Sequence, residues 1–454
     1  MSNSTVASSQ PAAPASSPPP ALRSVNPSAV ISAATSPDYG TLAARFRPVF
    51  ARIAAGAIAR EQSRTLAFAE VAELRAAGFH TLRSPAAYGG LGATLPQLFS
   101  LLLELAEADS NLSHLFRGHF AFLEGRLNLA DKPAQEIWFR RVTSGAIIGY
   151  AMAERTAHTG GDCRIFQEDG RWYIDGTKYY STGTIYADWI VAAVKDGNER
   201  VSVAMPVEAP GVERIDDWDG FGQRLTGSGT THFRRVPVPP ENIIRRFSAS
   251  ELFTHSYQKS FLQLILLTSA VGAGRAALRE GIGFVKPRTR AFGIPGLSSP
   301  KDDPLVHRVI GRVSSLVYAA QALQEATARD LEQLYQKAVE GTATEADYVA
   351  TEIRAYQAQQ IIFPQILDAV TYVFEVGGAS ATSETRRLDR HWRNVRTAAS
   401  HNPLIHREAA IGAYLLNGTV PDAAWRQEFE KPRQAAPAPD SAIPEPDQAT
   451  ACRA

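Results

Sequence analysis

The chain has 454 residues, of which 44% are hydrophobic, so it is long enough to bury a sizeable core without cross-links. Its 47 basic and 46 acidic residues give a formal net charge of +1, which leaves no basic surplus to neutralise a nucleic-acid backbone. The two cysteines, Cys163 and Cys452, cannot build a disulfide framework and lack zinc-ligand spacing, so we expect no bound metal and a reducing, cytoplasmic compartment.

Both ends of the chain are rich in Ala, Ser and Pro, which predicts disordered tails at residues 1–38 and 431–454. The first residues lack the basic start and the continuous apolar core of a secretory signal. The longest apolar stretch, Phe261–Ala277, is interrupted by polar residues and is too short to cross a bilayer. We therefore expect no membrane segment.

The folded body divides into three parts by its hydrophobic periodicity. Residues 39–145 repeat apolar positions with helical spacing, which predicts an N-terminal helical domain. Residues 146–247 alternate apolar and polar positions between tight turns, which predicts a middle antiparallel β domain. Long amphipathic runs return in residues 248–430 and predict a C-terminal four-helix bundle. The order of helices, strands and helices predicts an α+β fold.

Two polar turns stand out in the β domain. The segment AMAERTAHTGGD, Ala151–Asp162, is a Thr/Gly-rich turn whose backbone N–H groups and hydroxyls can meet the polar edge of a ligand. In the following hairpin, WYIDGTKYYSTG, strand alternation predicts that Tyr180 and Thr182 lie on the same face. An ordinary loop and a surface threonine are the alternative interpretations.

The segment Arg390–Arg407, RHWRNVRTAASHNPLIHR, carries four arginines and three histidines and no carboxylate. Steps of four and three residues stack its first arginines with Arg386 along one face of a helix. A solvated or ion-paired charge stripe is the plain interpretation of this pattern.

Five segments occur in a fixed order along the chain. They are SPAAYGGLGA at Ser84, AMAERTAHTGGD at Ala151, IDGTKYYSTG at Ile174, FGQRLTGSGTT at Phe221 and KPRTRAFG at Lys286. Together they resemble the signature segments of the acyl-CoA dehydrogenase superfamily, and the resemblance covers most of residues 40–420. It implies a helical domain, a β domain and a four-helix bundle, assembled as a homotetramer that is a dimer of dimers.

Three further segments narrow this resemblance. They are SHLFRGH at Ser113–His119, FEVGGAS at Phe374–Ser380 and LDRHWRNVRTAASHNP at Leu388–Pro403. They resemble the branch of flavin-dependent monooxygenases typified by the dibenzothiophene monooxygenases. Dehydrogenases of the superfamily usually place a carboxylate base near the last segment, where this chain has Asn394–Thr397. This argues against proton abstraction from carbon.

The resemblance implies catalytic roles for two histidines. His401 resembles the histidine that sits over the flavin and helps to form or protonate a C4a-hydroperoxide. His119 lies on an inward helical stripe and resembles a pocket histidine, whereas His114 and Arg117 lie off that stripe. A histidine satisfied by water at a helix end, or hydrogen-bonded in the core, is the structural alternative for each.

The resemblance also implies flavin contacts. Thr182 resembles a position next to flavin N5, and Tyr150 stands in the pocket where the dibenzothiophene enzyme carries Asn. Arg290 resembles the arginine that binds the flavin phosphate, with Arg288 as a close competitor. Other implied cofactor contacts are Gly378 and Ser380, of which Ser380 stands where that relative has an arginine.

The implied function is that of a two-component monooxygenase in sulfur acquisition. A separate NAD(P)H:FMN reductase would supply FMNH₂, because the chain shows no GxGxxG strand-to-helix fingerprint. A C4a-hydroperoxyflavin formed with O₂ would then oxygenate a thioether, sulfoxide or sulfinate. The alternatives are an acyl-CoA dehydrogenase with a displaced base and an amine or amino-sugar N-oxygenase on the same scaffold.

Overall fold

The computed structural model describes residues 30–32, 34–128, 132–154, 163–197, 199–247, 257–290 and 299–421. Most of the two predicted tails and residues 155–162 of the Thr/Gly-rich turn lie outside these ranges. The folded body begins earlier than predicted, because Ile31 is buried and its backbone N–H donates to the Tyr335 hydroxyl at 3.3 Å.

The N-terminal part is helical, as predicted. Its helices are α1 (Tyr39–Ser63), α2 (Phe68–Ala76), α3 (Leu95–Ala108), α4 (Ser110–Leu115), α5 (Arg117–Leu127) and α6 (Lys132–Thr143), with 3₁₀ turns at Phe79–Thr81 and Ala86–Tyr88. Local capping explains two of the starts. The Asp38 side chain accepts from the Thr41 N–H at α1, and Thr94 and Gln97 form a capping box at α3.

The middle part is one sheet. Its strands are β1 (Ile148–Ala151), β2 (Arg164–Glu168), β3 (Arg171–Lys178), β4 (Trp189–Asp196), β5 (Glu199–Pro206), β6 (Val212–Ile215), β7 (Thr230–Val238) and β8 (Ile243–Phe247), with 3₁₀ turns at Thr184–Tyr186 and Pro240–Asn242. The strand order is β6-β7-β3-β2-β4-β5-β8, and β1 pairs with β4. The sheet is mixed and not purely antiparallel as predicted, because β1 and β2 both run parallel to β4.

The chain leaves the sheet at the end of β3, before the residues predicted to share a face. β3 ends at Lys178, and Tyr180 has a φ of 55°, in the left-handed region that breaks strand alternation. Tyr180 is exposed, whereas Thr182 is half-buried. The prediction that both side chains lie on one strand face was therefore wrong.

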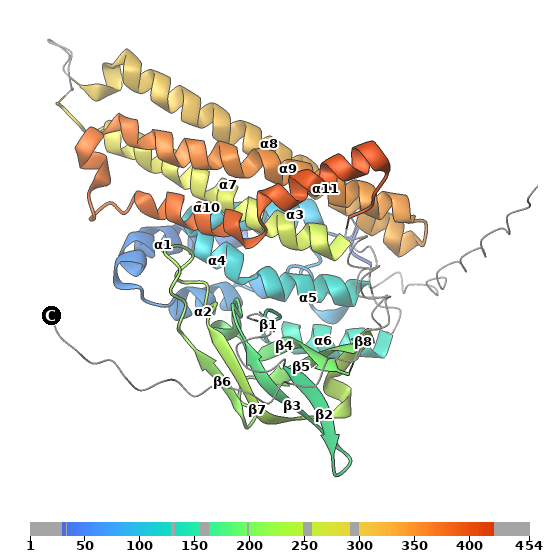
Figure 1. Cartoon of the computed structure of the whole chain (residues 1–454). Coiled ribbons are helices and arrows are strands. Elements are labelled where there is room, and N and C mark those ends of the chain that lie inside the picture. Colours follow the sequence, from blue (N-terminus) through green and yellow to red (C-terminus); the bar gives the residue numbers. More distant parts are fainter. Residues whose placement is uncertain are drawn as a thin grey trace, which may run out of the picture.

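The C-terminal part is a helical bundle. Its helices are α7 (Tyr257–Val285), α8 (Pro304–Glu340), α9 (Glu345–Tyr372), α10 (Asp389–His401) and α11 (Leu404–Asn417), with 3₁₀ turns at Pro300–Asp302, Val373–Val376 and Gly378–Thr382. Helices α7 to α10 pack together as the predicted four-helix bundle, and α11 packs on α9. Figure 1 shows this bundle on one side of the molecule and the sheet on the other, with α4 and α5 between them. The α+β class is thus confirmed.

Helix α7 is the central element of the core. It packs against α3, α4 and α5 as well as α8 and α9, so the two helical parts share one continuous apolar core. It is long and apolar enough to cross a membrane by length and composition alone, but 83% of its most apolar window is buried inside the protein. This burial fits the core helix of a bundle.

Candidate functional site

A buried histidine on α4 lies at the centre of the candidate site. His114 is 5% exposed, and its Nδ1 lies 3.1 Å from Oε1 of Gln223. Its Nε2 is buried and has no hydrogen-bond partner among the described residues. Because buried polar atoms in proteins are nearly always paired, this nitrogen is a candidate contact for a ligand.

The carboxamide of Gln223 is held by Asn394 on α10. The Gln223 backbone N–H donates to Oδ1 of Asn394 at 2.7 Å, and its Nε2 donates to the Asn394 carbonyl oxygen at 3.4 Å. The Gln223 oxygen therefore faces His114 and accepts the Nδ1 proton, which leaves the lone pair on Nε2. Burial, followed by the charge of Arg117, lowers the pKa of His114 to about 4, so the ring is neutral near pH 7.

His401, the last residue of α10, approaches the same place. Its Nε2 lies 3.3 Å from Nη1 of Arg117, the first residue of α5. The charge of Arg117 lowers the pKa of His401, which is exposed at the end of α10. Arg117 also donates from Nε to the Leu262 carbonyl oxygen at 3.0 Å. Two neutral histidines and one guanidinium thus meet where α4, α5 and α10 converge.

A chain of hydroxyl groups runs beside this cluster. Oγ1 of Thr182 lies 2.9 Å from Oγ of Ser228, which lies 2.7 Å from Oγ1 of Thr226. Thr226 in turn donates to the Gln223 carbonyl oxygen at 2.9 Å. Thr182 therefore belongs to the same polar assembly as the Gln223 turn, which is compatible with the cofactor contact predicted for it.

Tyr150 on β1 lies against the first turn of α5. A Cβ on Gly118 would lie 2.9 Å from Cγ of Tyr150, so only glycine leaves room for this ring. The Tyr150 backbone N–H donates to the Thr182 carbonyl oxygen at 3.4 Å. Burial raises the pKa of the phenol, against the lowering charges of Arg126 and Arg117, so Tyr150 remains a neutral hydrogen-bond donor. The structure brings Tyr150, Thr182 and Arg117 into one region.

The structure corrects the pocket role predicted for His119. This ring is fully buried, its Nε2 donates to the His80 carbonyl oxygen at 2.7 Å, and its Nδ1 accepts from the Ile148 backbone N–H at 3.2 Å. Both ring nitrogens are thus occupied by backbone groups. Burial lowers the pKa of His119 to about 3. His119 is a neutral core residue that fixes β1 to α5, and it has no free atom to offer a ligand.

The predicted phosphate contacts lie far from the histidines. Arg288 stacks on Phe284, with its Cζ 4.6 Å from the ring centroid, and Arg290 is exposed. Gly378 and Ser380 are exposed on the nearby 3₁₀ turn. Phe284 and Leu262, which contacts Arg117, are at opposite ends of α7 and about 33 Å apart at the helical rise. One copy of the chain does not bring these residues to the histidine cluster.

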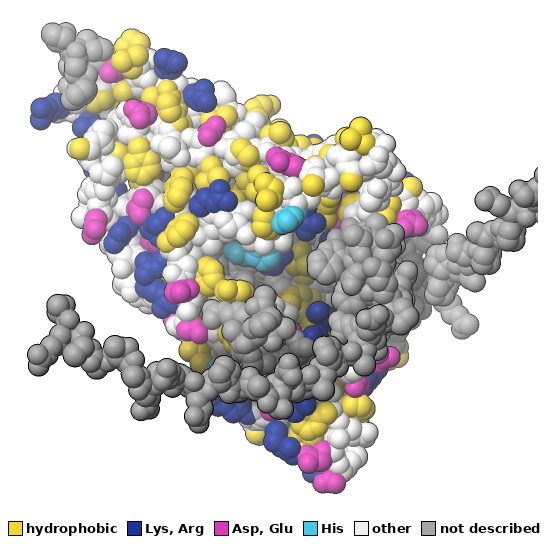
Figure 2. All heavy atoms as spheres, in the orientation of Figure 1, with side chains coloured by type: hydrophobic (Ala, Val, Ile, Leu, Met, Phe, Trp, Pro, Cys, Tyr) yellow, Lys and Arg dark blue, Asp and Glu magenta, His cyan; other side chains and the backbone are white. Residues whose placement is uncertain are grey.

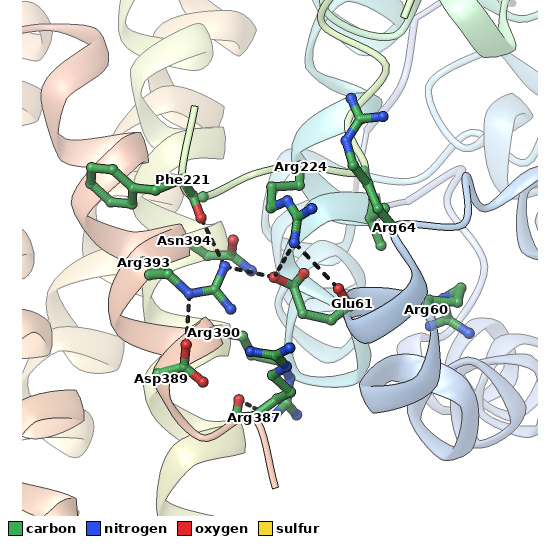
Figure 3. A network of polar contacts seen from close by, with 12 residues as sticks. Arg60, Glu61, Arg64, Phe221, Arg224, Arg387, Asp389, Arg390, Arg393 and Asn394 are labelled. Atoms are coloured by element: carbon green, nitrogen blue, oxygen red, sulfur yellow. Dashed lines mark hydrogen bonds and ion pairs between the residues drawn. The ribbon is translucent and has the colours of Figure 1, made fainter. Parts of the chain in front are cut away.

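A polar network holds the turn that carries Gln223 (Figure 3). Arg393 donates from Nη1 to Oε1 of Glu61 at 2.7 Å and to the Phe221 carbonyl oxygen at 2.8 Å. Arg224 also approaches Glu61, which is 2% exposed and lies on α1. A Cβ on Gly222 would lie 2.1 Å from the Arg393 carbonyl oxygen, so this turn presses directly on α10. The network therefore connects α1, α10 and the support of His114.

The surface is hollowed between the helical layer and the sheet. Figure 2 shows histidine side chains beside Lys and Arg side chains at this hollow. The molecule thus offers a basic, histidine-lined recess at the side where the bundle faces the β unit.

Comparisons with known proteins show which proteins the chain resembles. A family model described as acyl-CoA dehydrogenase, C-terminal domain, matches residues 264–404. A dibenzothiophene monooxygenase of Rhodococcus qingshengii is 29% identical over 81% of this chain and 91% of its own length. The probable FMNH₂-dependent monooxygenase SfnC of Pseudomonas putida is 28% identical over 83% of this chain and 94% of its own. FMN-bound TdsC from Paenibacillus sp. A11-2 has a TM-score of 0.78 at 25% identity, covering 84% of this chain and 98% of TdsC.

The helical part from residue 264 to 404 thus matches the C-terminal domain of acyl-CoA dehydrogenases, and the chain as a whole is similar to flavin-dependent monooxygenases. Sequence reasoning missed its most informative residue, His114, because the SHLFRGH segment was treated as one continuous helix. The structure breaks this segment at Phe116 into α4 and α5, and every residue of α4 is buried, including His114, which lies off the predicted inward stripe. Gln223 was missed because only the folded chain brings it to α10.

Proposed function

We propose that this monooxygenase is the oxygenase component of a two-component system, in which FMNH₂ and O₂ oxygenate a small organosulfur compound. The observation that carries the proposal is the pair of neutral histidines, His114 and His401, beside the guanidinium of Arg117. No carboxylate is among the groups that shift the pKa values of these three residues. Such a site can hold and return a proton without a carboxylate base.

The described residues fit a flavin. The unpaired Nε2 of His114 and the hydroxyl of Thr182 offer polar atoms to a ring edge, and Tyr150 adds a neutral phenol. When bound, reduced FMN supplies the electrons that activate O₂. His114 accepts and returns a proton at Nε2, and Arg117 stabilises negative charge that develops beside His401. The sulfur atom of the substrate is the proposed oxygen acceptor.

The dehydrogenase alternative is disfavoured by Asn394. This residue stands in the segment where superfamily dehydrogenases usually carry their base, and it is 3% exposed. Its carboxamide oxygen accepts from Gln223, and its Nδ2 donates to Oγ of Ser110 at 3.1 Å. A carboxamide cannot accept a proton from carbon at neutral pH. Asn394 therefore serves as a support for the Gln223 turn.

We propose that the flavin phosphate is bound by residues of a second copy in a homotetramer. Support comes from the separation of about 33 Å between the two ends of α7, which keeps Arg288, Arg290, Gly378 and Ser380 away from the histidines of the same chain. Arg386 stacks on Phe284 at 4.2 Å, beside Arg288, and adds a further cation to that end.

The test is the fate of labelled O₂ in the presence of an NAD(P)H:FMN reductase. We expect the label to enter thioether, sulfoxide or sulfinate substrates, with one oxygen atom reaching the sulfur product and the other leaving as water. If the label entered only amine substrates, the enzyme would be an N-oxygenase instead. Rapid anaerobic reduction of bound FMN by an acyl-CoA would overturn the proposal in favour of a dehydrogenase.

A further inference from the structure

A second arginine on α5, Arg126, is buried without an acceptor. It is 7% exposed, its Nε is fully buried, and no described residue accepts a hydrogen bond from its guanidinium. The guanidinium stacks on Phe122, with Cζ 5.1 Å from the ring centroid. Buried arginines are normally paired with carboxylates or carbonyl groups, because an unpaired charge inside a protein is strongly unfavourable. The guanidinium of Arg126 therefore lacks the carboxylate or carbonyl partner that a buried arginine normally has.

The guanidinium of Arg117 also lacks a negatively charged partner among the described residues. Its only hydrogen-bond partners among the described residues are the Leu262 carbonyl oxygen and His401, and neither carries a negative charge. Burial lowers the pKa of Arg117 to about 10 and also lowers that of Arg126 to about 10, with Tyr150 as the only group that opposes this in either case. Elsewhere in the described chain, the buried Arg83 has the Glu124 carboxylate as its partner.

The charges of both guanidinium groups act on the phenol of Tyr150. Tyr150 feels the charge of Arg126 and of Arg117, and its ring rests on Gly118, in the first turn of the same helix. Arg117 in turn contacts His401. The unpaired positive charge therefore begins at the proposed reaction centre and extends along α5 past the phenol of Tyr150.

We propose that Arg117 and Arg126, with the Tyr150 hydroxyl, form an oxyanion subsite, so that the substrate of this enzyme is an organosulfur anion bearing a sulfinate or carboxylate group. This inference rests on the proposed function and narrows its substrate class. Guanidinium groups suit planar or forked oxyanions because they donate two parallel hydrogen bonds. A neutral aromatic thioether would leave both charges uncompensated.

For a sulfinate the reaction balances without a further reactant. The sulfinate sulfur gains one oxygen atom from O₂ and becomes a sulfonate, losing two electrons. FMNH₂ supplies two electrons and two protons, and the second oxygen atom leaves as water. The product retains its negative charge, so the same arginines hold substrate and product.

The experiment compares matched anionic and neutral ligands in the full-length enzyme with FMN and a flavin reductase. (Methylthio)acetate and (methylthio)acetamide share one thioether and differ in charge. We expect the wild-type enzyme to prefer the anion. Arg126→Met should raise KM for the anion by about tenfold or more and leave KM for the amide within about twofold. Arg126→Lys should restore part of the preference, because it restores the charge.

Binding is measured separately, by thermal shift with methanesulfinate and with neutral methanesulfonamide. We expect methanesulfinate to stabilise the wild-type protein and to lose this effect in Arg126→Met. Without ligand, Arg126→Met should melt at a higher temperature than wild type, because it removes an unpaired buried charge. The matched control is Arg140→Met, an exposed arginine on α6 that pairs with Glu136 and should change none of these readouts.

Two results would overturn the subsite. One is equal turnover of the anion and the amide by wild type, which leaves the proposed monooxygenase function intact. The other is that Arg126→Met weakens the binding of FMN but not of riboflavin, and keeps the preference for the anionic substrate. Arg126 would then bind the flavin phosphate and not the substrate. Methanesulfinate binding that depends on Arg126, without any oxygen transfer to sulfur, would support the subsite and reject the proposed function.

Discussion

At the scale of single residues, burial keeps three histidines neutral, and one of them, His114, lies in the candidate site. His80, His114 and His119 are all buried, and their pKa values fall to about 4, about 4 and about 3. An unfolded histidine titrates near its ordinary pKa of 6.5. The unfolded chain therefore binds more protons than the folded chain below that pH, and folding stability decreases as the pH falls from about 6.5 toward 4.

This gives a prediction for His114→Gln. The variant removes one depressed histidine, so its melting temperature should fall less than that of wild type between pH 7 and pH 5. Between pH 7 and pH 5, the free energy of unfolding of the wild type should fall by on the order of 2 kcal/mol more than that of the variant, because the ring is buried. Thermal melting across this range measures it, with the exposed His406→Gln as the control. If the melting temperatures of the wild type and of His114→Gln fell equally with pH, this would contradict the lowered pKa of His114.

Gln223 is predicted to set the tautomer of His114. Gln223→Leu removes the acceptor at Nδ1, so the proton is no longer confined there and Nε2 is no longer held as a base. We expect oxygenation to slow by about tenfold or more with a small change in KM, and more H₂O₂ to be released for each NADH consumed. Gln321→Leu on α8, remote from the site, serves as the control. Unchanged coupling would show that the carboxamide does not act through His114.

At the scale of elements, α10 and α1 jointly hold the turn beneath His114. Arg393 bridges Glu61 and the Phe221 carbonyl oxygen, and Glu61 is almost fully buried. Arg393→Ala should lower stability by about 3 kcal/mol, because it leaves a buried carboxylate with a weaker partner. The melting temperature checks this, and Glu61→Gln combined with Arg393→Met should recover part of the loss. Arg396→Ala, one turn away on α10 and bonded to Ser400, should have little effect.

The same elements show what could be predicted from the sequence. Periodicity predicted the helical character of residues 39–145, because it depends on residues that are neighbours in the chain. The stripe that carries His119 is buried as predicted, but His114, which lies off that stripe, is also buried. The break at Phe116 has no Gly or Pro to mark it, so the sequence does not show that α4 is covered on more than one face. Trp392 on α10 is 38% exposed and stacks on Phe221. That contact joins segments far apart in the chain and leaves no local signal.

At the scale of the whole molecule, the order of helices and strands predicted the α+β architecture correctly. The mixed character of the sheet could not be predicted, because β1 and β4 pair in parallel across residues 152–188, and sequence alternation does not record strand direction. His401, for which the resemblance implies a catalytic role, is the last residue of α10. Its partner Arg117 comes from the N-terminal part, so their meeting follows only from the packing of the two helical parts.

The proposed division of the site between copies predicts an obligate oligomer. Light scattering should give a mass about four times the 49.2 kDa of the chain. Arg288→Ala combined with Arg290→Ala should weaken FMN binding more than riboflavin binding, because the lost contacts are to the phosphate. A monomer that binds FMN as tightly as the tetramer would contradict the shared site.

The most direct test of the central claim is a single turnover of the enzyme–FMNH₂ complex mixed rapidly with labelled O₂ and a sulfur substrate. We predict labelled sulfur product in stoichiometric ratio to the FMNH₂ consumed, and loss of this product in favour of H₂O₂ in His114→Ala and His401→Ala. Wild-type reducing equivalents recovered entirely as H₂O₂, for every thioether, sulfoxide and sulfinate tried, would contradict the account.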